Sequence, residues 1–157
     1  MGRNAESARR FGASDADLPL RRLMPYGVRK IGGVGPAVAA KLAKAGIRTT
    51  DGLLASCRDR RERRLLSERT GLPERQIQKF VNRADLMRIR GVGADFAELL
   101  VASGVRTVRE LSRRRPLNLA LKVSAVNAEK KLSRRAPSAS MVERWIAKAQ
   151  ELKDAAG

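Results

Sequence analysis

The sequence predicts an all-α protein in which two similar helical repeats pack as one compact domain. Three observations support this fold class. Alanine, leucine and arginine recur along the 157 residues, and long runs of β-branched residues are absent, so the composition favours helices over strands. No stretch as long as a strand alternates convincingly between apolar and polar residues. The third observation is an internal repeat.

The internal repeat is the strongest signal in the sequence. Residues 31–53 (IGGVGPAVAAKLAKAGIRTTDGL) align without a gap with residues 89–111 (IRGVGADFAELLVASGVRTVREL), at an offset of 58 residues. The similarity resumes at an offset of 65 residues, where Ile77, Phe80, Val81 and Ala84 match Val142, Trp145, Ile146 and Ala149. We interpret this pattern as a duplication in which each repeat ends in an amphipathic helix. The second connector is then seven residues longer than the first.

Proline, glycine and capping residues delimit the expected helices. Pro36 and Gly46 mark the two ends of one helix, because proline suits a first helical position and glycine a C-terminus. Thr50 or Asp51 is expected to cap a short helix that ends near residue 57. The remaining helices are expected at about 59–69, 74–88, 94–103, 107–114, 118–134 and 139–153.

The repeat also sets the expected domain boundaries. Residues 1–25 are expected to form a flexible basic arm, because apolar residues do not recur periodically along its first 20 positions. The first repeat then occupies residues 26–88 and the second residues 89–157.

The charge of the chain indicates a polyanionic partner. The net charge is +18, from 34 Lys and Arg against 16 Asp and Glu, and the excess is spread along the whole chain. Such a field attracts nucleic acids, with double-stranded DNA favoured here and RNA left open. Solubility or an Arg-rich genome are alternative explanations of the charge. Several basic pairs are expected on shared helix faces: Arg60 with Arg64, Lys130 with Arg134, and Lys131 with Arg135.

Missing residue types exclude several classes of site. The chain has no histidine, which removes Ser-His-Asp and Cys-His catalysis and every His-based metal site. Its one cysteine, Cys57, can form no internal disulfide and is expected to be a small buried apolar group. No apolar run approaches the roughly 20 residues of a membrane span, and no secretory signal is recognisable. We therefore expect no metal, no cofactor, no membrane contact and a cytoplasmic location, associated with the nucleoid if the source is bacterial.

The repeated pattern apolar-x-Gly-apolar-Gly-x-x-x-Ala-x-x-Leu resembles the helix-hairpin-helix motif of DNA repair and replication proteins. The duplicated layout, over about residues 26–153, also resembles a bacterial family, domain of unknown function 4332, that carries this motif twice. The resemblance implies tandem helix-hairpin-helix repeats, which are SAM-like helical units packed as one compact domain. It also implies a non-catalytic, largely sequence-independent DNA-binding protein.

The two Gly-Val-Gly turns are the candidate phosphate-binding sites. Glycine reaches positive φ without strain, and the missing Cβ lets a phosphate approach the backbone. Free amides and the helix dipole at the start of the next helix can then bind the anion, while Val34 and Val92 anchor the turns in the core. Such contacts carry little sequence preference. The candidate nucleic-acid-binding residues are Lys30, Gly33, Val34, Gly35, Lys41, Arg48, Arg90, Gly91, Val92, Gly93 and Arg106.

The main alternative is a helical adaptor for protein partners, in which Gly-Val-Gly is only a compact turn. Asp95 favours this alternative, because its carboxylate competes with a phosphate for the same amides. Pro25 and Gly27 also shorten the helix before the first turn. The C-terminal helix, with Trp145, is expected to belong to the core or else to seat a protein partner or a second copy of the chain.

A minor alternative is an abasic-site lyase. Lys41 lies where some of the resembling repair polymerases carry a lysine that forms a Schiff base with abasic sugars. That chemistry needs an amine of lowered pKa, and the sequence gives no sign of a desolvating pocket around it. We therefore expect no catalytic residue.

Overall fold

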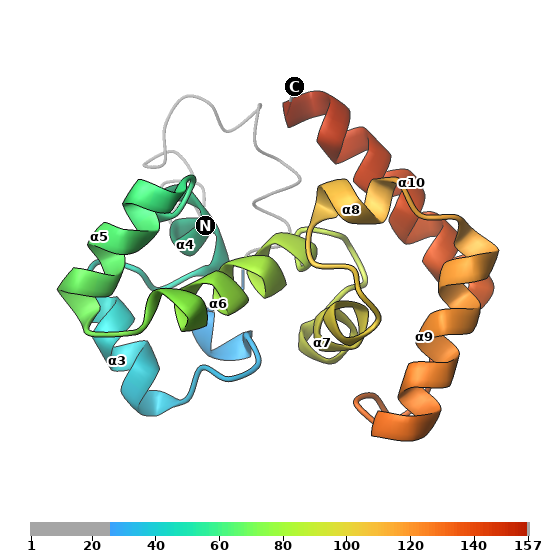
Figure 1. The fold of residues 1–157 in the computed structure, drawn as a ribbon, viewed down its shortest axis with the longest axis horizontal. Coiled ribbons are helices and arrows are strands. Elements are labelled where there is room, and N and C mark those ends of the chain that lie inside the picture. The colour runs from blue at the N-terminus through green and yellow to red at the C-terminus, as the bar shows by residue number, and fades with distance from the viewer. Residues whose placement is uncertain (1–25, 157) are drawn as a thin grey trace, which may run out of the picture.

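The computed structural model describes residues 26–156, with side chains described to residue 153. In this part of the chain, helices joined by short loops make up the fold (Figure 1). The elements are η2 (Val28–Lys30), α3 (Pro36–Lys44), α4 (Thr50–Ser56), α5 (Arg60–Thr70), α6 (Glu74–Leu86), α7 (Ala94–Ala102), α8 (Val108–Ser112), α9 (Pro116–Lys130) and α10 (Ala139–Ala156). The described residues contain no strand, and their one isolated bridge pairs Gly27 with Thr49. The all-α prediction is confirmed. The expected arm, residues 1–25, lies outside the described residues.

Local chemistry sets the helix boundaries. Pro36 begins α3, as predicted, and the Asp59 carboxylate caps α5 by accepting a hydrogen bond from the Glu62 amide at 2.8 Å. Gly71 ends α5 in the left-handed conformation (φ +78°), which glycine adopts without strain. None of the described helices is long and apolar enough to cross a bilayer.

Two of the expected helix boundaries are wrong. Thr49, rather than Thr50 or Asp51, caps α4, because its Oγ1 accepts a hydrogen bond from the Gly52 amide at 2.9 Å. The helix expected at 118–134 is α9, which ends at Lys130 because Lys131 takes a left-handed conformation (φ +52°). The expected helical pairs that reach residues 134 and 135 therefore do not form on α9, and these residues lie in the connector to α10.

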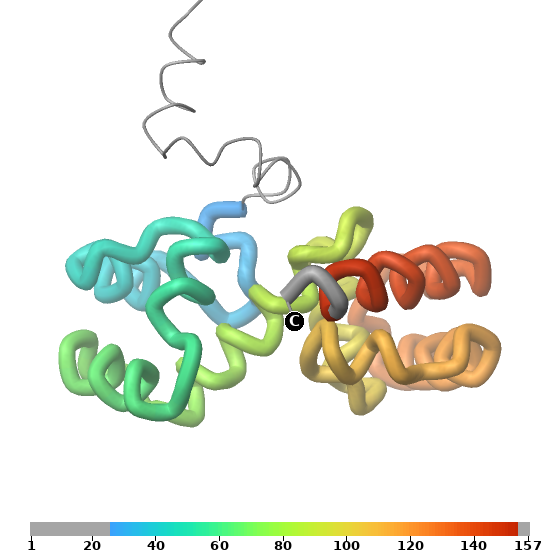
Figure 2. The backbone as a smooth tube through the Cα atoms, turned by 90° about the horizontal axis from the view of Figure 1, so that it is seen from above, coloured from blue at the N-terminus to red at the C-terminus, as the bar shows by residue number. Residues whose placement is uncertain are grey.

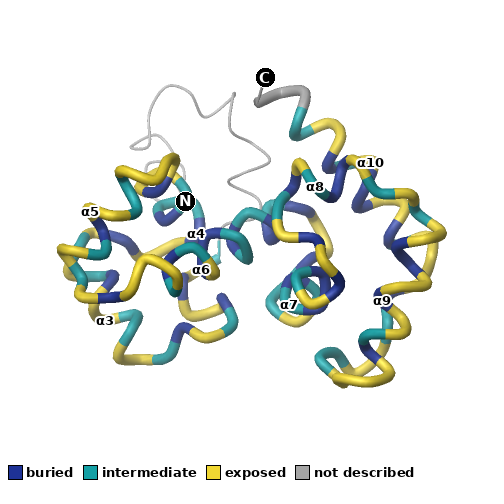
Figure 3. The backbone as a smooth tube through the Cα atoms, viewed as in Figure 1, coloured by how far each residue is buried: buried dark blue, intermediate teal, exposed yellow. Residues whose placement is uncertain are grey.

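The helices form two halves, α3–α6 and α7–α10, which lie side by side in both views (Figures 1 and 2). Helix α6 packs on α4 and α5 in its own half and on α7 in the other, whereas α10 packs on α8 and α9. One hydrophobic cluster spans both halves, and buried positions, coloured dark blue, occur in both of them (Figure 3). Its largest fully buried side chains include Leu42, Leu53, Ile77, Leu86, Ile89, Leu99, Leu100 and Leu111.

The aromatic positions matched by the repeat belong to this core. Phe80 on α6 and Trp145 on α10 are both buried, and the Trp145 ring contacts Phe96 with a centroid distance of 5.2 Å. Val142, Ile146 and Ala149 complete the buried face of α10. The core prediction for this stripe is therefore confirmed. Cys57 is also buried, as expected.

Candidate nucleic-acid interface

The first Gly-Val-Gly turn connects η2 to α3 through a tight loop. Gly33 adopts φ +92°, and the Val34 amide donates a hydrogen bond to the Ile31 carbonyl at 3.1 Å. Val34 is buried, so its side chain anchors the turn in the core as predicted. Gly35 then serves as the N-cap residue of α3 in an extended conformation.

The second turn has the same geometry between α6 and α7. Gly91 adopts φ +94°, and the Val92 amide donates to the Ile89 carbonyl at 3.0 Å. Val92 is fully buried, and Gly93 is the N-cap residue of α7, again extended. The two segments matched by sequence therefore share their backbone hydrogen bonds and glycine conformations.

An aromatic ring lies beneath the positive-φ glycine of each Gly-Val-Gly turn. A Cβ placed on Gly33 would lie 3.3 Å from Cε1 of Phe80, and one on Gly91 would lie 3.2 Å from Nε1 of Trp145. The sequence repeat matches these two aromatic residues to each other. Glycine is thus required at both positions by its φ angle and by the close approach of the ring.

The helices that follow the two turns begin without a side-chain cap. Neither Gly35 nor Gly93 can supply one, so the amides of the first turn of α3 and of α7 point outward without an intrahelical acceptor. Pro36 has no N–H, so α3 offers one amide fewer than α7. Helices α6 and α9 also begin without a side-chain cap, but Pro73 and Arg115 stand at those N-cap positions in place of glycine.

The fold gathers basic side chains at the second turn from distant parts of the chain. An open cavity of about 510 Å³ there is lined by Gly91, Gly93, Ala94 and Asp95 of the turn, by Tyr26, Lys30, Met87 and Phe96, and by Ser133, Arg134 and Arg135. Lys30, which precedes the first turn in sequence, therefore lies at the second. The sequence indicated the basic cluster of Arg134 and Arg135 but did not assign it to this site.

A buried asparagine holds the connector that carries the two arginines. The Asn127 side chain accepts a hydrogen bond from the Ser133 amide at 2.9 Å and donates one to the Ser133 carbonyl at 3.1 Å. This pair of bonds fixes the chain just before Arg134 and Arg135. In the sequence, Asn127 continues the apolar stripe of Leu119 and Val123, and this polar residue at a core position was the signal that could have located the connector.

The other candidate residues lie at different distances from the turns. Arg90 is exposed and immediately precedes Gly91, so it adjoins the second turn without lining the cavity there. Lys41 is exposed in the last turn of α3. Arg48 and Arg106 are exposed beyond the C-terminal ends of α3 and α7, and each of these nine-residue helices is about 13 Å long. Arg48 and Arg106 therefore lie about one helix length away from the Gly-Val-Gly turns.

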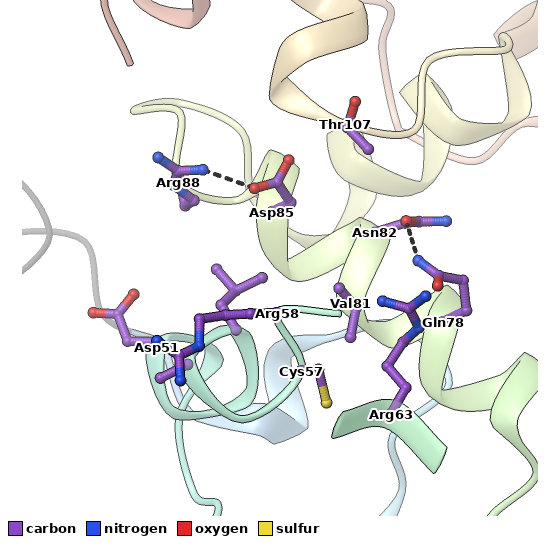
Figure 4. A pocket seen from close by; sticks show the side chains of 12 residues that line it. Asp51, Cys57, Arg58, Arg63, Gln78, Val81, Asn82, Asp85, Arg88 and Thr107 are labelled. Atoms are coloured by element: carbon purple, nitrogen blue, oxygen red, sulfur yellow. Dashed lines mark hydrogen bonds and ion pairs between the residues drawn. The ribbon is translucent and has the colours of Figure 1, made fainter. Parts of the chain in front are cut away.

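A separate cavity of about 540 Å³ lies between the two halves, bordered by α4, α6 and Thr107 (Figure 4). Four of its polar side chains are paired with one another: Arg88 with Asp85 at 2.8 Å and the Gln78 amide with the Asn82 oxygen at 2.9 Å. Asp85 also accepts a hydrogen bond from the Val108 amide at 2.7 Å. The bond from Val108 joins α6 to α8 across the two halves, whereas the other two lie within α6 or at its end.

Cys57 also lines that cavity, and its thiol is kept protonated. Burial raises the pKa of Cys57 from 9.0 to about 11, an effect that Arg63 partly offsets and Glu62 reinforces. At neutral pH the thiolate fraction is therefore very small. Such a thiol is a weak nucleophile.

Comparison with known protein families identifies a match over most of the chain. Residues 32–152, which include both Gly-Val-Gly turns, match the family described as Domain of unknown function (DUF4332). No curated protein and no solved structure matches the chain.

Proposed function

This chain belongs to the DUF4332 family, and from this premise we propose that it is a non-catalytic, largely sequence-independent DNA-binding protein. In this proposal the halves are tandem helix-hairpin-helix repeats, and the two Gly-Val-Gly turns contact phosphates of the duplex backbone.

The second turn is the single observation that carries the proposal. There, an uncapped helix N-terminus approached through glycine faces an open cavity lined by Lys30, Arg134 and Arg135. Free amides and the dipole of α7 favour an anion, and the three cations supply the charge to attract one. DNA is the polyanion that suits a net charge of +18, because its backbone presents negatively charged phosphate groups in a continuous row.

The two turns are expected to bind unequally. The first turn of α7 offers one more amide than that of α3, and the cationic cavity adjoins α7. Asp95 works against this advantage, because it is exposed in the first turn of α7 and repels the phosphate. We therefore expect the second turn to provide the tighter contact and Asp95 to limit its strength.

Lyase chemistry at Lys41 finds little support in the geometry. Lys41 is exposed in the last turn of α3, so water reaches its ammonium group. A Schiff-base lysine needs desolvation or a neighbouring cation to lower its pKa. We propose a phosphate-contacting role for this residue instead.

One observation favours the adaptor as a second candidate function. Leu117 and Leu121 lie one turn apart on α9 and are 66 % and 64 % exposed. The apolar face of α10 is already buried inside the chain, so a protein partner would dock on α9. An adaptor of this kind would not depend on the Gly-Val-Gly turns.

A polarisation titration on one labelled duplex at several salt concentrations tests the proposal. Log K should fall linearly with log salt, by about 0.9 per phosphate neutralised. Lys30→Glu with Arg90→Glu should lower both the affinity and the slope. The matched control, Arg60→Glu with Arg61→Glu, reverses two exposed charges on α5 away from the turns. Equal losses in the two double variants would reject the turns as the site, and no binding by the folded wild type would favour the adaptor.

A further inference from the structure

Helix α6 carries a row of basic residues beside the first turn. Arg75, Lys79 and Arg83 are spaced four residues apart, so they lie on one face of the helix. They line an open cavity of about 660 Å³, whose other lining residues are Gly32, Gly33, Pro73, Gln76, Phe80 and Glu98. The cavity thus joins the row to the two glycines of the first turn.

The guanidinium of Arg83 is held in this cavity with an unused donor. Its side chain is 16 % exposed, and its Nε atom is buried without a hydrogen-bond acceptor among the described residues. Its nearest acid is Glu98, whose Oε2 lies 3.9 Å from Nη2, too far for a hydrogen bond. The Nε and Nη2 edge of a guanidinium is the edge that binds two oxygens of one phosphate.

Glu98 lies between this arginine and the first turn. Its Oε1 would be 2.9 Å from a Cβ on Gly32, so the carboxylate lies directly against this glycine. The Glu98 side chain is 42 % exposed and loosely paired, and therefore free to rotate into solvent. An incoming anion can displace it and take its place beside Arg83.

We propose that this cavity is a phosphate site for the DNA strand that passes the first turn, with Arg83 binding one phosphate through Nε and Nη2. Arg75 and Lys79 contact the same strand further along. The inference rests on the proposed function and extends it to a site that includes none of the charged residues predicted from the sequence. Phe80, which is buried, forms an apolar floor beneath the charged groups.

The length of the row favours a strand over a single free anion. Eight residues of helix separate Arg75 from Arg83, which is about 12 Å along the axis. One strand of duplex DNA presents a phosphate about every 3.4 Å of its axis. The row is therefore long enough for a stretch of backbone, whereas an isolated phosphate would occupy only the Arg83 end.

Nitrogen-15 NMR of the full chain tests the site directly. The Arg83 Nε–H signal, assigned by its loss in Arg83→Lys, should shift and saturate as duplex DNA is added, with the same midpoint as the Gly33 amide. A shift of the Gly33 amide without one at Arg83 would overturn this site and leave the proposed function standing. A shift with inorganic phosphate but not with duplex would overturn the assignment to DNA. Failure of all signals to respond to duplex would overturn both proposals.

Matched variants give an independent readout in the polarisation titration. Arg75→Gln with Lys79→Gln should weaken binding at least tenfold and lower the salt slope by about 1–2. The control, Lys122→Gln with Lys130→Gln, removes the same charge from exposed positions on α9 in the other half. Glu98→Gln should tighten binding more than Glu129→Gln, an exposed acid on α9. Equal effects within both comparisons would overturn the site.

Discussion

Alanine substitution of Gly35 and Gly93 separates binding from folding. Both glycines are N-cap residues in extended conformations, and a Cβ on either would meet no atom within 4 Å. The added methyl group would instead occupy the space through which a phosphate reaches the helix amides. The variant with both substitutions should therefore fold like the wild type and bind DNA more weakly.

The expected change in stability is small because two terms oppose each other. Replacing glycine by alanine stabilises by about 0.4–1 kcal/mol per site through the entropy of the unfolded chain. Alanine is a poorer N-cap than glycine, which costs about 1 kcal/mol. The free energy of unfolding should therefore change by no more than about 1 kcal/mol for the pair.

The expected loss of affinity is larger. A hydrogen bond to a charged group contributes about 1.5–3 kcal/mol, and tenfold in affinity corresponds to about 1.4 kcal/mol. Blocking both turns should thus weaken duplex binding at least tenfold, and about a hundredfold or more if each turn loses one such bond.

Gly33→Ala and Gly91→Ala provide the contrasting pair. Their positive φ angles cost alanine about 1–2 kcal/mol per site, and the new methyl groups would press on the Phe80 and Trp145 rings. These variants should lose stability, with melting temperatures several degrees lower. Thermal melting by circular dichroism and polarisation titration on one duplex measure both effects. Wild-type affinity in a folded Gly35→Ala/Gly93→Ala variant would refute phosphate binding at the turns.

Three further predictions follow from individual side chains. At pH 8 the raised pKa of Cys57 leaves about a hundredfold less thiolate than an ordinary cysteine has. Iodoacetamide should therefore alkylate the folded protein about a hundredfold more slowly than the unfolded chain. Equal rates would contradict the burial of the thiol. Asn127→Ala should cost about 1–3 kcal/mol by removing both bonds to Ser133, and should weaken DNA binding by releasing the arginines that follow; unchanged affinity would show that the connector does not contribute. Asp95→Asn should raise the affinity for duplex DNA about threefold to fivefold and lower the free energy of unfolding by about 0.3–1 kcal/mol. Glu129→Gln is the control for the change in charge alone. An equal gain in affinity in both variants would place Asp95 away from the phosphate.

The sequence was sufficient for the fold class and for the local turns, because both depend on residues close in the chain. Glycine and proline spacing predicted α3 and the anchoring of Val34 and Val92. The short η2 before the first turn also agrees with the shortening expected from Pro25 and Gly27. The cap of α4 was misplaced by one residue, because neighbouring threonines and an aspartate can all act as N-caps.

The charged surroundings of the turns were not predictable in the same way. Lys30 reaches the second turn only because the two halves pack together. Arg134 and Arg135 were expected on a helix, but the left-handed conformation of Lys131 ends α9 and turns them toward α7. The row on α6 shows a helical spacing in the sequence, yet only the folded chain brings Arg83 beside Glu98 and Gly32.

Helix α6 closes the packing of the first half and leads directly into the second Gly-Val-Gly turn. It contacts α4, α5 and α7, and Asp85 near its end bonds the amide of Val108 in α8. Loss of α6 would therefore remove packing from both halves at once. The protein should unfold in a single cooperative transition, and amide hydrogens in the core of α6 should exchange only through global unfolding, more slowly than those of α3 or α9.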